Sequence, residues 1–127
     1  MKGASVLLDS SAWIEIFGHG PLVKACQSEL RSASAVCVPT VVLFEVYRKI
    51  TQQVSEDSAL SAIAVLTQNS IADLTQEIAL SAADLSIAHK LPMADSLILA
   101  HALRSGSTLI TLDNDFASIP GVKVIRG

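Results

Sequence analysis

The chain has 127 residues, of which 50% are hydrophobic, and it carries a formal net charge of −3. This length and composition predict one folded domain over residues 1–127 and exclude a disordered chain, and the negative charge argues against a large basic face for nucleic acid. Because the sequence has neither a secretory signal nor an apolar run near the roughly 20 residues of a membrane span, we expect a cytoplasmic protein without membrane contact.

Short aliphatic runs alternate with longer helical patterns along the whole chain. The predicted strands cover residues 4–8, 35–38, 70–73, 107–112 and 122–125. The predicted helices cover residues 11–18, 21–32, 40–53, 56–68, 76–90 and 93–105. Ser10 or Ser11 suits the N-cap of the first helix, and Gly106 suits the end of the last one. Ser55 and Thr75 suit two later N-caps. This alternation predicts an α/β fold in which a short parallel β-sheet is flanked by helices on both faces.

Acidic residues follow two of the predicted strands. Asp9 ends the apolar run 4–8, and Asp113 and Asp115 follow the run 108–112. In open α/β sheets, ligands bind beyond the carboxyl ends of the strands, so these acids are predicted to lie at one edge. A carboxylate in an apolar surround is costly unless a positive charge pairs with it, and few cations are near these positions.

Two further acids interrupt predicted helices. Asp95 lies in the first turn of the helix 93–105, where the helix dipole favours an anion, and it shares a face with Ile98 and Leu99. Glu45 lies at the boundary between the apolar and the charged face of the helix 40–53. Acids from four separate segments are therefore predicted to converge.

Each acid also has a simpler explanation. Asp9 could cap the helix that follows it, and Glu45 could be a surface partner of Lys49 one turn later. Asp95 could satisfy backbone N–H groups, and residues 113–115 could form an ordinary turn. These explanations cover the acids singly, whereas a divalent-metal site covers all of them together.

The other reactive side chains do not predict a second site. His19, His89 and His101 are scattered along the chain and are read as structural or surface residues. Cys26 and Cys37 show no metal-binding spacing and are expected to be reduced and buried. Asp84 shares a predicted helix face with apolar residues, and no feature of the sequence assigns it a role. Oxygen ligands alone suit a hard cation such as Mg²⁺ or Mn²⁺.

Four segments carry these acids, and a short apolar segment follows the last of them. They are VLLDSS at 6–11, VPTVVLFE at 38–45, LPMADSLILA at 91–100, TLITLDNDF at 108–116 and IPGV at 119–122. In this order, over nearly the full chain, they resemble the PIN-domain nucleases, and especially the VapC-type toxins of bacterial and archaeal toxin–antitoxin pairs.

The resemblance implies a Mg²⁺- or Mn²⁺-dependent endoribonuclease that hydrolyses RNA phosphodiester bonds, forms a homodimer and binds a small antitoxin protein. The positions that match the family's catalytic acids are Asp9, Glu45, Asp95 and Asp113. The positions that match its metal ligands are Asp9, Asp95 and Asp113, with Asp115 as an alternative to Asp113. Ser10 and Thr111 match hydroxyl positions that act through these acids.

RNA also needs positive contacts, and four basic residues are placed to contact backbone phosphates. They are Arg48 and Lys49, which follow Glu45, and Lys90 and Arg104, which flank the helix 93–105. Solvated surface charge is the simpler explanation for any one of them.

Two other classes of protein fit parts of the pattern. A receiver-like phosphoacceptor domain has similar length and acids at strand ends, but it needs a lysine after a late strand, and none follows the strand 107–112. A non-catalytic interaction module with the PIN fold would keep the architecture without the activity. In that case the helices near 11–32 are the expected contact surface for an antitoxin or a second copy.

Overall fold

The computed structural model describes residues 4–127, and it contains the predicted alternation of strands and helices. The strands are β1 (Val6–Leu8), β2 (Cys37–Pro39), β3 (Ser70–Ala72), β4 (Thr108–Thr111) and β5 (Val122–Val124). The helices are α1 (Ser10–Phe17), α2 (Val23–Ser32), α3 (Thr40–Gln53), α4 (Glu56–Leu66), α5 (Gln76–His89) and α6 (Met93–Ser105). A short 3₁₀ helix, η1 (Asn114–Phe116), was not predicted. The bounds of α3 and α6 agree with prediction at both ends, and the other elements differ by a few residues.

All strand pairs are parallel. β4 pairs with β1 on one side and β5 on the other, and β2 pairs with β3. An isolated bridge between Val6 and Val36 links β1 to the segment leading into β2. The two sheets, β1-β4-β5 and β2-β3, are joined by this bridge in the order β3-β2-β1-β4-β5, which differs from the 2-1-3-4-5 order of receiver-like folds. The receiver-like alternative is therefore wrong.

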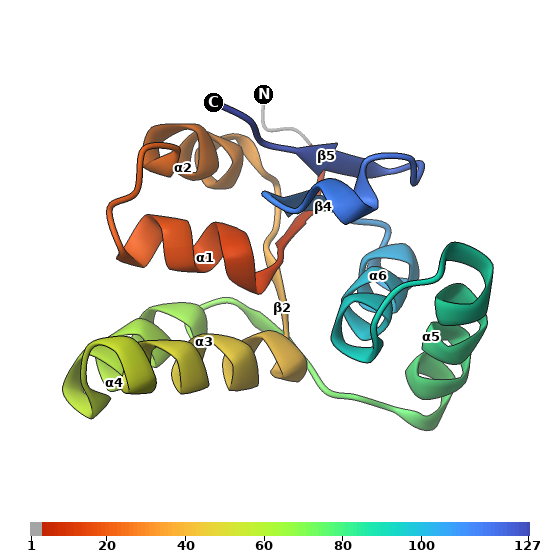
Figure 1. The fold of residues 1–127 in the computed structure, drawn as a ribbon, viewed down its shortest axis with the longest axis horizontal. Coiled ribbons are helices and arrows are strands. Elements are labelled where there is room, and N and C mark those ends of the chain that lie inside the picture. Colours follow the sequence, from red (N-terminus) through yellow and green to blue (C-terminus); the bar gives the residue numbers. More distant parts are fainter. Residues whose placement is uncertain (1–3) are drawn as a thin grey trace.

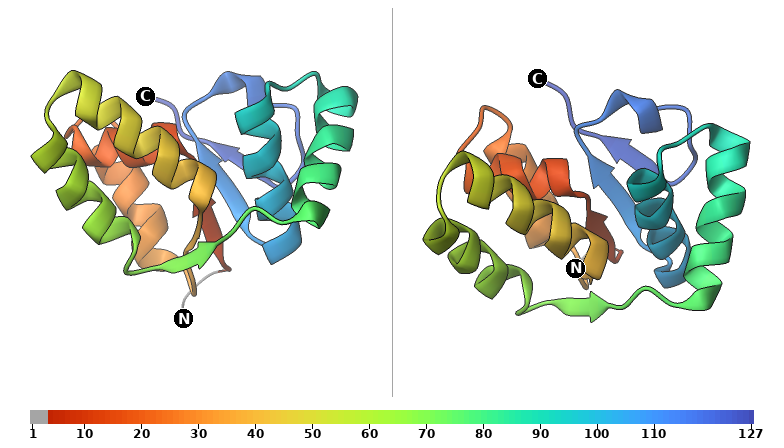
Figure 2. Two further views of the ribbon diagram at one scale, coloured as in Figure 1. Left: turned by 90° about the horizontal axis from the view of Figure 1, so that it is seen from below. Right: turned by 60° about the horizontal axis from the view of Figure 1, so that its bottom comes forward.

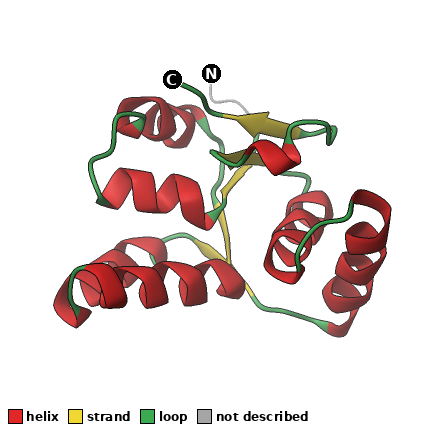
Figure 3. Ribbon diagram, in the orientation of Figure 1, coloured by secondary structure: helices red, strands yellow, loops and turns green. Residues whose placement is uncertain are grey.

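The helices cover both sides of these short strands. α1 to α4 lie on one side and α5 and α6 on the other (Figures 1 and 2), so the strands form a narrow central column (Figure 3). Leu7 and Leu8 of β1 and Leu109 and Ile110 of β4 are fully buried, as expected for parallel strands covered on both faces. A smaller apolar cluster joins α5 to α6. Within residues 4–127, no helix is long and apolar enough to cross a membrane.

The start of α1 corrects one prediction. Asp9, and not Ser10 or Ser11, is the N-cap of this helix, because the Asp9 side chain accepts a hydrogen bond of 3.1 Å from the backbone N–H of Ala12. Ser10 is instead the first residue of the helix. The later caps agree with prediction: Ser55 and Thr75 cap α4 and α5.

The two cysteines are free and buried, as expected. At the end of α6, Gly106 adopts the left-handed conformation, with φ of 66°, that lets the chain turn towards β4.

Candidate active site

The register of β1 against β4 brings Asp9 beside Thr111. Leu8 lies opposite Ile110, and the Asp9 N–H donates to the Ile110 carbonyl at 3.0 Å, which extends the pairing one residue beyond β1. The Thr111 hydroxyl then donates to Asp9 Oδ2. Asp9 is only 4% exposed, and this burial raises the pKa of its carboxyl, although hydrogen bonds from Ser11, Thr111 and the backbone lower it in part.

Two hydroxyls hold Asp9 and the end of β4 in one arrangement. Ser11 Oγ donates to Asp9 Oδ1 at 2.6 Å and accepts from the Leu112 N–H at 3.0 Å. Thr111 Oγ1 accepts from the Asp113 N–H at 3.0 Å. Sequence reasoning considered Ser11 only as a helix cap; its place two residues after a strand-end acid, in the first helical turn, is the signal that could have indicated its contact with Asp9.

Glu45 reaches the same region from α3, which begins directly after β2. Its Oε1 atom is buried and has no hydrogen-bond partner among residues 4–127. Burial raises the pKa of Glu45, a contact with the Ser10 hydroxyl lowers it in part, and the charge of Asp9 raises it further. The Ser10 hydroxyl thus contacts Glu45, whereas the hydrogen bonds to the Asp9 carboxylate come from Ser11, Thr111 and the Ala12 N–H.

The pKa of Asp95 is affected by the charges of all the other candidate acids. Burial in the first turn of α6 raises its pKa first, and the charges of Asp113, Asp9, Glu45 and Asp115, in decreasing order, raise it further to about 6. We call Asp9, Glu45, Asp95 and Asp113 the acid cluster. The four predicted segments are therefore close enough in space for their carboxylates to repel one another.

Asp113 and Asp115 differ in their surroundings. Asp113 is partly buried, and its Oδ1 caps η1 by accepting from the Asp115 N–H at 2.9 Å. Asp115 is exposed, and its charge is the weakest of the four that act on Asp95. This geometry favours Asp113 over Asp115 as the member of the cluster. Asp84, in contrast, is exposed on α5 and lines a separate surface depression with Arg104.

Among residues 4–127, no lysine or arginine forms an ion pair with the acid cluster. The ion pairs within residues 4–127 join Arg104 to Glu77 and Lys123 to Glu29, so neither involves a cluster acid. In the same part of the chain, no three acidic, histidine or cysteine side chains converge closely enough to hold an ion as they stand. Ion binding would therefore require these side chains to adjust.

The chemistry of the cluster fits a divalent cation. Its donors are all carboxylate oxygens, which hard cations prefer, and burial raises the pKa of three of its carboxyls. The buried Glu45 Oε1 lacks any partner within the described residues, and a cation would supply one. The histidines do not compete for this role, since His19 and His89 are exposed and His101 lies six residues beyond Asp95 on α6, which is about 1.7 turns.

The four basic residues proposed for RNA contact are not equivalent in space. Arg48 and Lys49 are exposed on α3, and with Ser10, Ser11 and Glu45 they line a cavity of about 440 Å³, which we call the polar cavity. Lys90 is exposed at the end of α5. Arg104 is paired with Glu77 and lies nine residues, about 13 Å along the helix axis, from Asp95.

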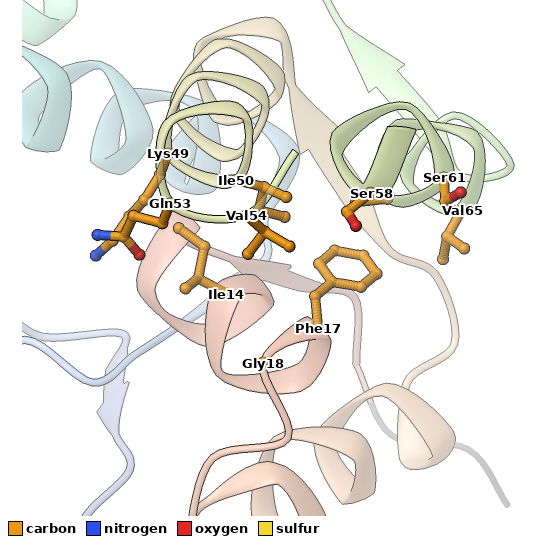
Figure 4. Close-up of a pocket in the computed structure, with 11 residues that line it drawn as sticks. Ile14, Phe17, Gly18, Lys49, Ile50, Gln53, Val54, Ser58, Ser61 and Val65 are labelled. Carbon is orange, nitrogen blue, oxygen red and sulfur yellow. The ribbon is translucent and has the colours of Figure 1, made fainter. Parts of the chain in front are cut away.

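A second cavity, which we call the apolar cavity, adjoins the polar one. It has a volume of about 420 Å³ and lies between α1 and the α3–α4 pair. Figure 4 shows Ile14 and Phe17 of α1 facing Ile50 and Val54. The residues that line both cavities are Ile14, Lys49 and Gln53.

The α/β fold, with a cluster of buried and half-buried acids at the carboxyl edge of a short parallel sheet, agrees with the family that a sequence comparison finds. A sequence model of the PIN domain matches residues 6–122. The chain therefore belongs to the PIN domain family. A search of curated proteins found no match.

Solved structures of toxin–antitoxin proteins are similar over nearly the whole chain. A toxin–antitoxin complex from Klebsiella pneumoniae matches with a TM-score of 0.80 and 26% identity, covering 94% of this chain and 96% of that one. A sarcin–ricin-loop-cleaving VapC toxin from Mycobacterium tuberculosis matches with a TM-score of 0.76 and 16% identity, covering 91% and 95%. A promoter-bound VapBC complex from Rickettsia felis matches with a TM-score of 0.74 and 16% identity, covering 97% and 98%.

Proposed function

We propose that this protein is a divalent-metal-dependent endoribonuclease that acts as the toxin of a toxin–antitoxin pair. The observation that carries the proposal is the acid cluster, in which burial and like charges raise the pKa of Asp95 to about 6 while no cation pairs with it within residues 4–127. The similar structures support it, because they include toxin–antitoxin complexes and a toxin described as cleaving the sarcin–ricin loop.

The residues proposed to hold the ion are Asp9, Asp95 and Asp113, with Glu45 beside them. Because every donor is an oxygen, Mg²⁺ or Mn²⁺ suits the site. When bound, such an ion activates a water molecule and neutralises charge on the scissile phosphate.

The protein's own groups orient the reactants. Asp9 is fixed by the hydroxyls of Ser11 and Thr111, so its carboxylate keeps one orientation towards the cluster. The Glu45 carboxylate, which lies beside these acids, would accept the proton that the attacking water loses. The water oxygen bonds to phosphorus as the bond to the 3′-oxygen breaks, and the released 3′-oxygen takes up a proton from solvent, which leaves a 5′-phosphate and a 3′-hydroxyl. No ribose 2′-hydroxyl takes part.

The proposed partners are RNA, a small antitoxin and a second copy of the chain. Toxin–antitoxin complexes among the similar structures support the antitoxin. RNA and antitoxin would both be met in the cytoplasm, where we expect the protein to act.

The first test is cleavage of a total-RNA pool that contains ribosomal RNA. We expect cutting with Mg²⁺ or Mn²⁺, no cutting with EDTA, and no cutting by the Asp95→Asn variant. Asp84→Asn is the matched control, because it makes the same chemical change at an exposed acid outside the cluster and should cut normally.

Two outcomes would contradict the proposal. Cutting by Asp95→Asn at the wild-type rate would place the chemistry elsewhere. Failure of the wild-type protein to cut RNA or to bind Mn²⁺ would leave a non-catalytic module with the PIN fold as the better description.

A further inference from the structure

Phe44 is a large apolar side chain that the fold leaves in solvent. It is 65% exposed, although its neighbours Val42 and Val46 on α3 are fully buried. It directly precedes Glu45 of the acid cluster, and both side chains line the polar cavity. Covering an exposed aromatic ring at the edge of a candidate active site with a ligand is favourable, because apolar surface is removed from water.

The polar cavity has the chemistry of a nucleotide site rather than a protein-docking site. Seven of its nine lining residues are polar or charged, and Phe44 and Ile14 are the other two. The neighbouring apolar cavity is the better place for a hydrophobic anchor of a protein partner, since Phe17, Ile50, Val54 and Val65 line it. A single aromatic ring among hydroxyls, amides and cations suits a flat base attached to a charged backbone.

Helical spacing orders these groups along α3. Phe44 and Arg48 are four residues apart and share a face, as do Glu45 and Lys49. These two pairs of side chains follow α3 from the acid cluster towards Gln52 and Gln53 at the far end of the polar cavity. A strand whose phosphate lies at the acid cluster would therefore place an adjacent base near Phe44 and a neighbouring phosphate near Arg48.

We infer that the polar cavity binds one nucleotide of single-stranded RNA beside the cleaved phosphate, with its base stacked on Phe44 and its phosphate at Arg48. The inference rests on the proposed nuclease function. Single-stranded RNA is required, because only an unpaired base can leave its stack and meet an aromatic side chain. Stacking accepts any base, so Phe44 contributes affinity and placement without selecting the sequence.

The test measures binding of a single-stranded RNA oligonucleotide carrying 2-aminopurine to protein with the Asp95→Asn change, so that no cutting interferes. Phe44→Ala should weaken binding about tenfold and restore the probe fluorescence that stacking quenches. Phe44→Tyr keeps the ring and should bind normally. Leu60→Ala, at a 51% exposed leucine on α4, is the matched control and should also bind normally.

The salt dependence of RNA affinity distinguishes the contribution of the Phe44 ring from that of the Arg48 charge. Arg48→Ala should lower the slope of log affinity against log salt by about 0.7, the value for one phosphate of a single strand, whereas Phe44→Ala should leave the slope unchanged. In the otherwise wild-type enzyme, Phe44→Ala should raise KM about tenfold and change kcat less than about twofold, as expected for lost uniform binding.

Three results would overturn the inference. Equal RNA affinity of Phe44→Ala and wild type would remove the stacking role while leaving the nuclease untouched. Normal RNA binding by Phe44→Ala together with loss of self-association or antitoxin binding would assign Phe44 to a protein interface. Absence of RNA binding by every variant, together with absence of cleavage by the wild type, would overturn the nuclease as well.

Discussion

At the scale of single residues, Asp9 combines two explanations that the sequence presents as alternatives. Its Oδ1 caps α1 through the Ala12 N–H and accepts from Ser11, while its Oδ2 accepts from Thr111. Capping places the carboxylate at the start of α1, and the hydroxyls fix its rotation. In one conformation, the Asp9 side chain therefore both caps α1 and belongs to the acid cluster.

The Thr111 hydroxyl should stabilise the fold because it serves two buried groups. Thr111→Val would leave Asp9 Oδ2 and the Asp113 N–H without this partner, at a cost of about 1–3 kcal/mol. Urea unfolding at pH 7 measures the loss. Thr111→Ser keeps the hydroxyl and should lose less. Thr108→Val, on the same strand, is the control, and equal stability of both valine variants would contradict the prediction.

Asp95 should destabilise the metal-free protein at neutral pH. Its folded pKa of about 6 exceeds the ordinary value of 3.8, so the folded state holds the proton more tightly. The stability that protonation gives is present below about pH 4 and is lost as the pH rises through about 6. Asp95→Asn should therefore raise the Tm in EDTA at pH 7.5 by about 4 °C, on the order of 1 kcal/mol once solvent screening is allowed for.

The pH dependence of this effect is its control. The Tm difference between wild type and Asp95→Asn should shrink as the pH falls and vanish below about pH 4, where Asp95 is neutral in both states. Asp84→Asn should show no such trend, because Asp84 is exposed on α5. A difference that stays constant from pH 7.5 to pH 4 would rule out charge as its cause.

At the scale of elements, the acid cluster joins parts of the chain that are remote in sequence. It draws on the ends of β1 and β4, the middle of α3 and the first turn of α6. The parallel pairing of β1 with β4 brings the two strand ends together, and α3 and α6 bring their acids to the same edge. A cation at this edge would bind side chains from four elements, so metal binding should stabilise the whole fold.

Mn²⁺ should consequently raise the thermal stability of the wild-type protein. An ion present at 100 times its Kd, and bound only by the folded state, adds about 2.7 kcal/mol at 25 °C. Differential scanning fluorimetry with and without Mn²⁺ measures the shift. Asp95→Asn should lose most of it and Asp84→Asn should keep it; an equal shift in all three proteins would point to binding elsewhere.

At the scale of the whole molecule, the exposed apolar side chains bear on where a second copy would bind. Within residues 4–127 none of the large exposed hydrophobics lies on α1 or α2, the helices near 11–32 for which a contact with an antitoxin or a second copy stays a prediction. Leu80 and Ile87, seven residues apart on one face of α5, are 62% and 81% exposed. This face is the better candidate for the homodimer proposed above.

The homodimer prediction can be tested by size-exclusion chromatography with light scattering. We expect the wild type to run as a dimer and Ile87→Glu to run as a monomer, because a buried unpaired carboxylate disfavours the interface. Leu60→Glu, on α4, should remain dimeric. A monomeric wild type at working concentration would remove the homodimer from the proposal.

Local patterns in the sequence determined most of the architecture. Aliphatic runs alternating with helical periodicity predicted the parallel α/β fold, and Gly106 indicated the end of α6. Acids that end aliphatic runs predicted Asp9 and Asp113 at the sheet edge, because a strand end is a local feature. The first-turn position of Asp95 on an apolar helix face was also readable from spacing alone.

The tertiary structure decided what depends on contacts between remote residues. Only the β1–β4 register puts Thr111 on Asp9, and only the packing of α1 beside β4 lets Ser11 reach Leu112. The ion pair of Arg104 with Glu77 and the exposure of Phe44 beside the polar cavity depend likewise on which elements meet. Periodicity in a sequence gives the face on which a side chain lies, but the partner across from that face is set by the fold.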